Sequence, residues 1–263
     1  MKLIVADLDG TLLHKKNISS QTIDTINKLK DQGYLFTLAT GRHMQATKPI
    51  VDELKIELPV ICTNGAFIYD FNSNHVIHQE TIPFEVVENT LQLLNQYNLD
   101  YLIYTTSHIV STQRSKEKLE QRIGQVNSKV ITHETLKEEI EQGVLKILVI
   151  DERDDMIHHI KKMLNQESSL NMVQSQKAFL DIGFYKASKG RALTILAKFL
   201  AIDLSDILAI GDQENDISMI EVSGVGVAMG QGDEVLKSKA NFITKSFNDE
   251  GFTYAINELI LSK

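Results

Sequence analysis

Short apolar runs alternate, in the first part of the chain, with stretches whose apolar residues recur at helical spacing. The apolar runs have the length of strands that are buried on both faces of a sheet, and they are residues 3–6, 34–40 and 59–65. Between the first two runs, Ser19 and Ser20 precede a helical pattern that Gly33 ends, as expected for a serine cap and a terminal glycine. A second helix is predicted around 43–55.

The end of the chain repeats this alternation. Helical patterns are predicted at 188–202, 214–223 and 249–261, and strands at 206–212, 224–230 and 240–244. Strands that alternate with helices of this length form right-handed crossover units and a parallel sheet. Both ends of the chain are therefore predicted to build one doubly wound, Rossmann-like α/β core.

The middle of the chain follows a different pattern. Helical stretches alternate there with several short strands, a mixture that is typical of an α+β layer with an antiparallel sheet. The simplest architecture is a core formed by residues 1–82 and 188–263, with a second domain of residues 83–187 inserted between the two pieces. We expect that inserted domain to select the substrate.

Composition and charge narrow the class of function. The chain has 263 residues and a net charge of −8, which argues against a general nucleic-acid binder. An anionic substrate would therefore need a metal ion or a local cluster of cationic side chains. No apolar run approaches the roughly 18 residues of a membrane span. A single cysteine, Cys62, and the absence of a signal-peptide pattern predict a cytoplasmic protein.

Polar residues follow four predicted elements of the core, at the ends where ligands bind in open α/β sheets. They are Asp7-Leu8-Asp9 after the first strand, Thr40-Gly41-Arg42 after the second, Lys189 at the start of a helix, and Asp212 with Asn215-Asp216 after a later strand. If these strands are neighbours, residues that are far apart in the sequence meet at one edge of the sheet.

Carboxylates dominate this set. The four aspartates are Asp7, Asp9, Asp212 and Asp216. Gathered at one point, they would repel one another strongly without a cation. A hard divalent cation relieves that repulsion, and oxygen ligands of this kind suit Mg²⁺, which takes a few carboxylates and keeps several waters. We therefore expect Mg²⁺ as the cofactor.

A magnesium site supplies positive charge for a phosphate group, and other residues fit the same anion. Lys189 adds a second point charge, and Thr40 offers a hydroxyl. The backbone N–H groups around Leu8 and Gly41 can line an anion site. One aspartate of the first pair can attack phosphorus, while the other protonates the leaving oxygen and then activates water.

The sequence motifs DLDGT, ATGR, SKG and GDQEND, in this order and spacing, resemble the haloacid dehalogenase-like (HAD) phosphatase superfamily. The insertion between ATGR and SKG is similar to that of the Cof-type subfamily, whose members carry a large α/β cap there. The resemblance spans nearly the whole chain. It implies a Mg²⁺-dependent phosphatase that acts on small phosphomonoesters, with a cap that closes over the core.

The resemblance also implies a role for each motif residue. Asp7 matches the nucleophile, which is also a magnesium ligand. Asp9 matches the general acid/base, whose backbone carbonyl binds the metal. Thr40 and Lys189 match the residues that hold the transferring phosphoryl group. The remaining matches are Asp212 as a later metal ligand, Asn215 near the phosphate, and Asp216 as support of the metal site.

Some positions depart from the family pattern or stay open. Gln231-Gly232 stand where an asparagine–alanine pair is common, which leaves local loop contacts undefined. Arg42 has two possible roles, contact with the substrate or pairing with a carboxylate of the core. The sequence does not name the substrate, and sugar phosphates, nucleotides, flavin mononucleotide and pyridoxal phosphate are all compatible with the family. It makes no prediction of oligomeric state.

Two other functions share this chemistry. A phosphomutase would use the same aspartate but exclude water, and it would release an isomerised product without inorganic phosphate. A phosphate-sensing module would keep a long-lived phosphoaspartate, for which the Asp9 acid/base and the inserted domain are superfluous. The lifetime of a phosphorylated Asp7 separates sensing from catalysis.

Overall fold

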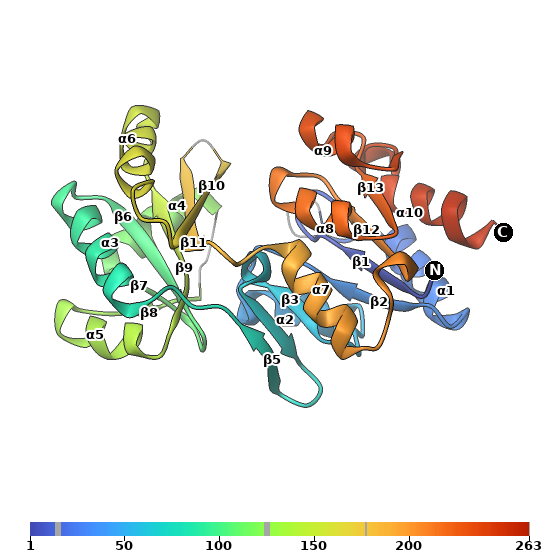
Figure 1. Cartoon of the computed structure of the whole chain (residues 1–263), viewed down its shortest axis with the longest axis horizontal. Coiled ribbons are helices and arrows are strands. Elements are labelled where there is room, and N and C mark those ends of the chain that lie inside the picture. The colour runs from blue at the N-terminus through green and yellow to red at the C-terminus, as the bar shows by residue number, and fades with distance from the viewer. Residues whose placement is uncertain (14–16, 124–126, 177, 263) are drawn as a thin grey trace. The chain divides into compact units, whose positions relative to one another are not determined.

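The computed structural model describes residues 1–13, 17–123, 127–176 and 178–262. The chain forms two compact units (Figure 1). The first consists of residues 1–78 and 188–263, and the second of residues 79–187. The first unit is therefore assembled from the two ends of the chain, and the second is a continuous insertion.

The sheet of the first unit is parallel. Its strands, in spatial order, are β14 (Phe242–Ile243), β13 (Val225–Ala228), β12 (Ile207–Gly211), β1 (Leu3–Ala6) and β2 (Leu35–Leu38). All four pairings between neighbouring strands are parallel. Strand β1 lies inside the sheet, where all of its residues are buried. This confirms the predicted parallel α/β core.

Helices cover both faces of that sheet. They are α1 (Ser20–Asp31), α2 (Met44–Glu53), α7 (Lys189–Phe199), α8 (Ile217–Val222), α9 (Glu234–Lys239) and α10 (Gly251–Ile256), the last continuing as a π-helical turn over Asn257–Leu261. On one face, Leu196 of α7 and Met219 of α8 pack in one cluster with Val5. On the other, Phe36 meets Phe252 of α10 edge-on, with 6.1 Å between the ring centroids. The sheet is thus doubly wound, as the alternating pattern predicted.

A small antiparallel sheet extends the first unit beyond β2. It contains β3 (Val60–Cys62), β4 (Phe67–Asp70) and β5 (His75–Gln79). A parallel bridge between Ala39 and Ile61 ties β3 to the end of β2. The turn that follows β3 consequently lies beside the carboxyl end of β2, where the ATGR motif begins.

The second unit has its own sheet and core. Its strands, in spatial order, are β10 (Leu170–Gln176), β11 (Phe179–Phe184), β9 (Val144–Ile150), β6 (Asp100–Thr105), β7 (Ile109–Ser111) and β8 (Lys129–Val130). Its helices are α3 (Phe84–Gln96), α4 (Gln113–Ile123), α5 (His133–Glu141) and α6 (Asp154–Leu164). Its pairings are antiparallel except for β7 with β8, which confirms a separate α+β layer in the middle of the chain.

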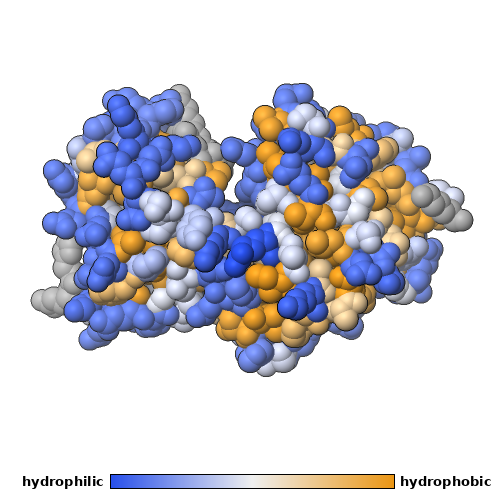
Figure 2. All heavy atoms as spheres, in the orientation of Figure 1, coloured by the Kyte–Doolittle hydropathy of each residue, from blue (hydrophilic) through white to orange (hydrophobic). Residues whose placement is uncertain are grey.

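Apolar side chains of the second unit gather in its interior, where Leu94, Ile147 and Ile160 belong to one buried cluster. Hydrophilic residues cover most of the face of this unit that Figure 2 shows. None of the helices among the described residues has both the length and the apolar character needed to cross a membrane.

Candidate active site

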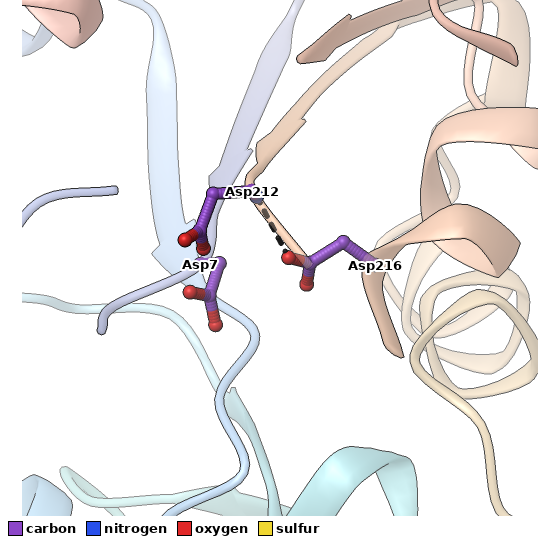
Figure 3. Close-up of side chains that lie close together, drawn as sticks. All are labelled: Asp7, Asp212 and Asp216. Carbon is purple, nitrogen blue, oxygen red and sulfur yellow. Dashed lines mark hydrogen bonds between the residues drawn. The ribbon is translucent and has the colours of Figure 1, made fainter. Parts of the chain in front are cut away.

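Three of the predicted carboxylates meet at the carboxyl end of the parallel sheet. Asp7 directly follows β1 and Asp212 directly follows β12, and these strands pair in register with Ala6 opposite Ile210. Asp216 comes from the turn beyond β12. Figure 3 shows the three side chains gathered at the strand ends. One oxygen from each lies within 4.8 Å of the others, and all three residues are buried.

Lys189 is the cation that accompanies this cluster. Ser188 caps α7 by accepting a hydrogen bond from the N–H of Arg191 at 3.2 Å, which sets Lys189 in the first turn of the helix. The Lys189 ammonium group is fully buried and donates to Asp7 Oδ1 at 2.5 Å and to Asp216 Oδ1. A buried ammonium needs such partners, because burying an unpaired charge is costly.

Asp216 uses both of its carboxylate oxygens. One oxygen binds Lys189. The other, Oδ2, accepts from the backbone N–H groups of Asp212 at 2.9 Å and of Gln213 at 3.0 Å. Asp216 therefore holds in place both Lys189 and the loop that carries Asp212. Direct metal ligation by Asp216 stays a prediction.

The charges in this cluster do not balance. Burial raises the pKa of Asp7 well above its usual range; Lys189 counteracts that rise, while Asp216 and Asp212 add to it. Burial, followed by repulsion from Asp216, raises the pKa of Asp212 to about 6. Burial lowers the pKa of Lys189, but the carboxylates of Asp216 and Asp7 outweigh it, so that the net shift is upward. One ammonium group thus faces three carboxylates.

The excess of negative charge in this cluster indicates that a metal ion would fit the site. The donors are buried carboxylate oxygens, which are the hard ligands that divalent cations such as Mg²⁺ take. An added divalent cation would compensate the two carboxylate charges that Lys189 leaves. The site can therefore hold a divalent metal. Backbone N–H groups bind the carboxylate of Asp216, whereas side chains bind those of Asp7 and Asp212, so these two carboxylates are the ones available to ligate the metal.

Asp9 lies apart from this cluster. Its carboxylate is paired with Arg42, whose Nε donates to Oδ2 at 2.7 Å and whose Nη2 donates to Oδ1 at 2.6 Å. The Asp9 side chain is 57% exposed. Three carboxylates rather than four therefore meet at one point in the described residues. The metal contact expected of Asp9 is through its backbone carbonyl and stays a prediction, while Arg42 takes the carboxylate-pairing role of its two alternatives.

The second motif lies next to the first. Thr40 is buried at the end of β2, and its N–H donates to the carbonyl of Ile61 at 2.8 Å. Its hydroxyl oxygen accepts from the N–H of Arg42 at 3.2 Å, which shapes the tight turn through Gly41. Because β1 and β2 are paired, this turn is adjacent to the loop of Asp7 and the buried Leu8.

Asn215 forms a hydrogen bond with Asn64, a residue that the sequence did not single out. The Asn215 amide donates from Nδ2 to Asn64 Oδ1 at 3.0 Å. Asn64 belongs to the turn after β3, and the Asn-Gly pair at the end of the predicted strand 59–65 was the available signal.

A second unpredicted residue is Gln231, at one of the positions that depart from the family pattern. Its Nε2 donates to the carbonyl of Gly10 at 2.7 Å, and its Oε1 accepts from the N–H of Phe247 at 2.7 Å. Gln231 thus braces the loop that carries the aspartate pair. No sequence signal pointed to this bridge.

The fold and the site together define a class of protein, and comparison with known proteins identifies it. Residues 4–256 match the family model of the haloacid dehalogenase-like hydrolases. The chain belongs to this family, which confirms the resemblance carried by the four motifs.

Curated relatives cover nearly the whole chain. A 5-amino-6-(5-phospho-D-ribitylamino)uracil phosphatase of Bacillus subtilis is 31% identical, over 99% of this chain and 98% of the relative. A pyridoxal phosphate phosphatase of Escherichia coli is 30% identical, over 92% of each chain. The chain is accordingly an enzyme, a phosphatase of the haloacid dehalogenase-like class.

Solved structures show the same fold throughout. A haloacid dehalogenase-like hydrolase from Bacteroides thetaiotaomicron superimposes with a TM-score of 0.88, at 28% identity, over 98% of this chain and 99% of that one. A haloacid dehalogenase-like hydrolase from B. subtilis gives a TM-score of 0.83 at 30% identity, over 99% and 100% of the two chains. Both units of this protein are therefore present in its structural relatives.

Proposed function

We propose that this protein is a Mg²⁺-dependent phosphatase that hydrolyses small phosphomonoesters through an aspartyl-phosphate on Asp7. The observation that carries the proposal is the buried cluster of three carboxylates around one lysine, at the carboxyl end of a parallel sheet. Such a cluster suits a divalent cation and, with it, the phosphate group of a substrate.

The first step is nucleophilic attack by the Asp7 carboxylate. An oxygen of Asp7 forms a bond to phosphorus as the ester P–O bond breaks, and Asp9 gives a proton to the leaving oxygen. A bound Mg²⁺ would neutralise charge on the transferring phosphoryl group. Lys189 adds a fixed positive charge there, and the Thr40 hydroxyl and the backbone N–H groups of Leu8 and Gly41 are the proposed hydrogen-bond donors.

The second step hydrolyses the aspartyl-phosphate. Asp9, now ionised, takes a proton from a water molecule whose oxygen attacks phosphorus. Inorganic phosphate leaves and the Asp7 carboxylate is restored. The exposure of Asp9 supports its role, since an exposed carboxyl group can exchange its proton with solvent. Asp216 is proposed to support the metal site, because its carboxylate holds Lys189 and the loop that carries Asp212.

The substrate is proposed only by chemical class. The two curated relatives are named for different compounds that share a phosphomonoester. We propose a small phosphorylated metabolite, with residues 83–187 as the cap that selects it. A nucleic-acid partner is not part of the proposal, because the net charge is −8. A cytoplasmic location remains a prediction from the sequence.

Phosphate release from a panel of phosphomonoesters tests this function. The wild-type protein should release inorganic phosphate with Mg²⁺ and lose that activity with a chelator. Asp7→Asn should abolish turnover, because an amide oxygen is a poor nucleophile. Asp31→Asn changes an exposed aspartate at the end of α1 and serves as the matched control that retains activity. Magnesium-dependent turnover that persists in Asp7→Asn would rule out the proposed mechanism.

A further inference from the structure

The turn that follows β3 has an unusual backbone. Thr63, Asn64 and Gly65 are three consecutive residues with positive φ angles, of 51°, 54° and 92°. For a β-branched residue such as Thr63, this conformation is a genuine outlier. The Thr63 hydroxyl is also buried, with no hydrogen-bond partner among the residues that the structure describes. Backbone strain of this kind persists only where the surroundings enforce it, and it clusters at functional sites.

The phosphate-binding loop of the second motif enforces one side of this turn. The N–H of Thr63 donates to the carbonyl of Arg42 at 2.9 Å, and the N–H of Asn64 donates to the carbonyl of Thr40 at 3.0 Å. Two successive amides of the turn thus fix the carbonyl groups on either side of Gly41. The turn and the loop form one hydrogen-bonded unit.

The start of α7 enforces the other side. A Cβ atom on Gly65 would lie 2.2 Å from the carbonyl oxygen of Ser188 and 2.9 Å from the backbone nitrogen of Lys189. Only glycine permits that approach, and glycine also accepts the positive φ angle. The turn is therefore in close contact with the residue that caps α7 and positions Lys189.

The side chain of Asn64 connects this turn to a third element. Its Oδ1 accepts the hydrogen bond from Asn215 Nδ2 at 3.0 Å and lies 2.8 Å from the position that a Cβ atom on Gly41 would take. The other end of the amide, Nδ2, makes no hydrogen bond within the described part of the chain. Asn64 is half-buried.

We propose that Asn64 is a positioning residue of the phosphoryl site, which orients the amide of Asn215 against the loop of Thr40 and Gly41. The inference rests on the proposed function, because Thr40 and Gly41 are phosphate-binding residues only within it. Asn215 is placed near the phosphate by the family resemblance. The strained turn fixes the position of Asn64 Oδ1. Because this oxygen accepts from Asn215 Nδ2, it fixes the orientation of the Asn215 amide. The Nδ2 group of Asn64 is a further hydrogen-bond donor in the same turn.

Asn64→Gly tests the inference, because glycine keeps the positive φ angle and removes only the side chain. We expect kcat/KM for p-nitrophenyl phosphate, and the affinity for inorganic phosphate with Mg²⁺ measured by calorimetry, to fall about tenfold. Asn215→Ala should give a similar loss, and the double variant no more than the larger single loss. Asn74→Gly is the matched control, since Asn74 has a φ angle of 52° in the turn between β4 and β5 of the same unit.

Asn64→Asp provides a second variant that keeps the shape of the side chain and its accepting oxygen. A carboxylate at this position repels the phosphate group, so we expect weaker binding of inorganic phosphate, most clearly at low ionic strength. A role limited to supporting the turn would leave that affinity unchanged.

Three outcomes would overturn the inference. They are wild-type kinetics and phosphate affinity in Asn64→Gly, additive losses in the double variant, and unchanged phosphate affinity in Asn64→Asp. Failure of the proposed function is seen separately, as a wild-type protein that hydrolyses no phosphomonoester. In that case the phosphate-affinity measurements on the same variants still decide whether Asn64 and Asn215 act together.

Discussion

Lys189 holds the charged residues of the site together. It is fully buried and contacts two of the three clustered carboxylates, Asp7 and Asp216. A buried ion pair adds little stability by itself, but removal of one partner leaves an uncompensated buried charge. Lys189 therefore has a structural role in the absence of metal as well as its proposed role toward the phosphoryl group.

Lys189→Met is predicted to destabilise the protein strongly. The free energy of unfolding at pH 7 in the presence of chelator should fall by about 3 kcal/mol or more, because Asp7 and Asp216 lose their counter-charge. Denaturant unfolding of the wild type and the variant measures this change. Adding Asp7→Asn to Lys189→Met should recover part of the loss, and a single variant within about 1 kcal/mol of the wild type would contradict the prediction.

Site residues that lie within a short sequence motif could be predicted, and those outside such a motif could not. Asp7, Asp212 and Asp216 were predicted to meet because each follows a core strand or its first turn. The pairing of Asp9 with Arg42 was left open, since it depends on how two loops approach each other. The contacts of Asn64 and Gln231 were not predicted for the same reason, because they cross between loops that no sequence period defines.

At the level of elements, the long apolar strands and amphipathic helices of the core were predictable from their periods. Helix α9 and strand β8 were not predicted. Each is short, with six and two residues respectively, and too brief to show a hydrophobic period. Helix α9 begins because Asp233 caps it, accepting from the N–H groups of Val235 and Leu236.

A buried carboxylate holds three elements of the second unit together. Glu139 of α5 accepts a hydrogen bond from Lys129 of β8. It also accepts one from Nε2 of His108, which lies in the turn between β6 and β7, at 2.7 Å. Burial would raise the pKa of Glu139, but the hydrogen bonds from Lys129 and His108 outweigh it, so the pKa is lowered from its ordinary value of 4.5. The ionised form is therefore stabilised in the folded protein.

This lowered pKa predicts a pH dependence of stability. A carboxyl group with a depressed pKa contributes stability above its unfolded pKa, and that contribution is lost as the pH falls through the folded value. Glu139→Gln should lower the free energy of unfolding by about 1–3 kcal/mol at pH 7. The difference from the wild type should shrink as the pH falls below 4.5, the ordinary value for this group. Unfolding curves at several pH values check this, and a difference that grows in acid would contradict it.

For the whole molecule, the site belongs to a unit assembled from both ends of the chain. The loop of Asp7 lies in the first segment, and Lys189, Asp212 and Asp216 lie in the second. The sheet order places β1 against β12 and so brings the two segments together. The inserted unit has a separate hydrophobic core.

Metal binding is consequently predicted to stabilise one unit more than the other. At a Mg²⁺ concentration of 100 times the dissociation constant, the gain is about 2.7 kcal/mol. Hydrogen exchange of the full chain should slow in residues 1–78 and 188–262 on addition of Mg²⁺, with little change in residues 79–187. Asp212→Asn should abolish the effect. Equal slowing in both units, or the same slowing in the variant, would contradict this assignment of the site.

Identification of the phosphorylated residue tests the central claim most directly. In Asp9→Asn, p-nitrophenyl phosphate can still phosphorylate Asp7, because its leaving group needs little protonation, but the intermediate lacks the base that activates water. We predict a burst of about one p-nitrophenolate per active site, followed by slow turnover. Acid quenching and mass spectrometry of the peptides should then locate the phosphate on Asp7. No burst, or a phosphate on any other residue, would contradict the proposed mechanism.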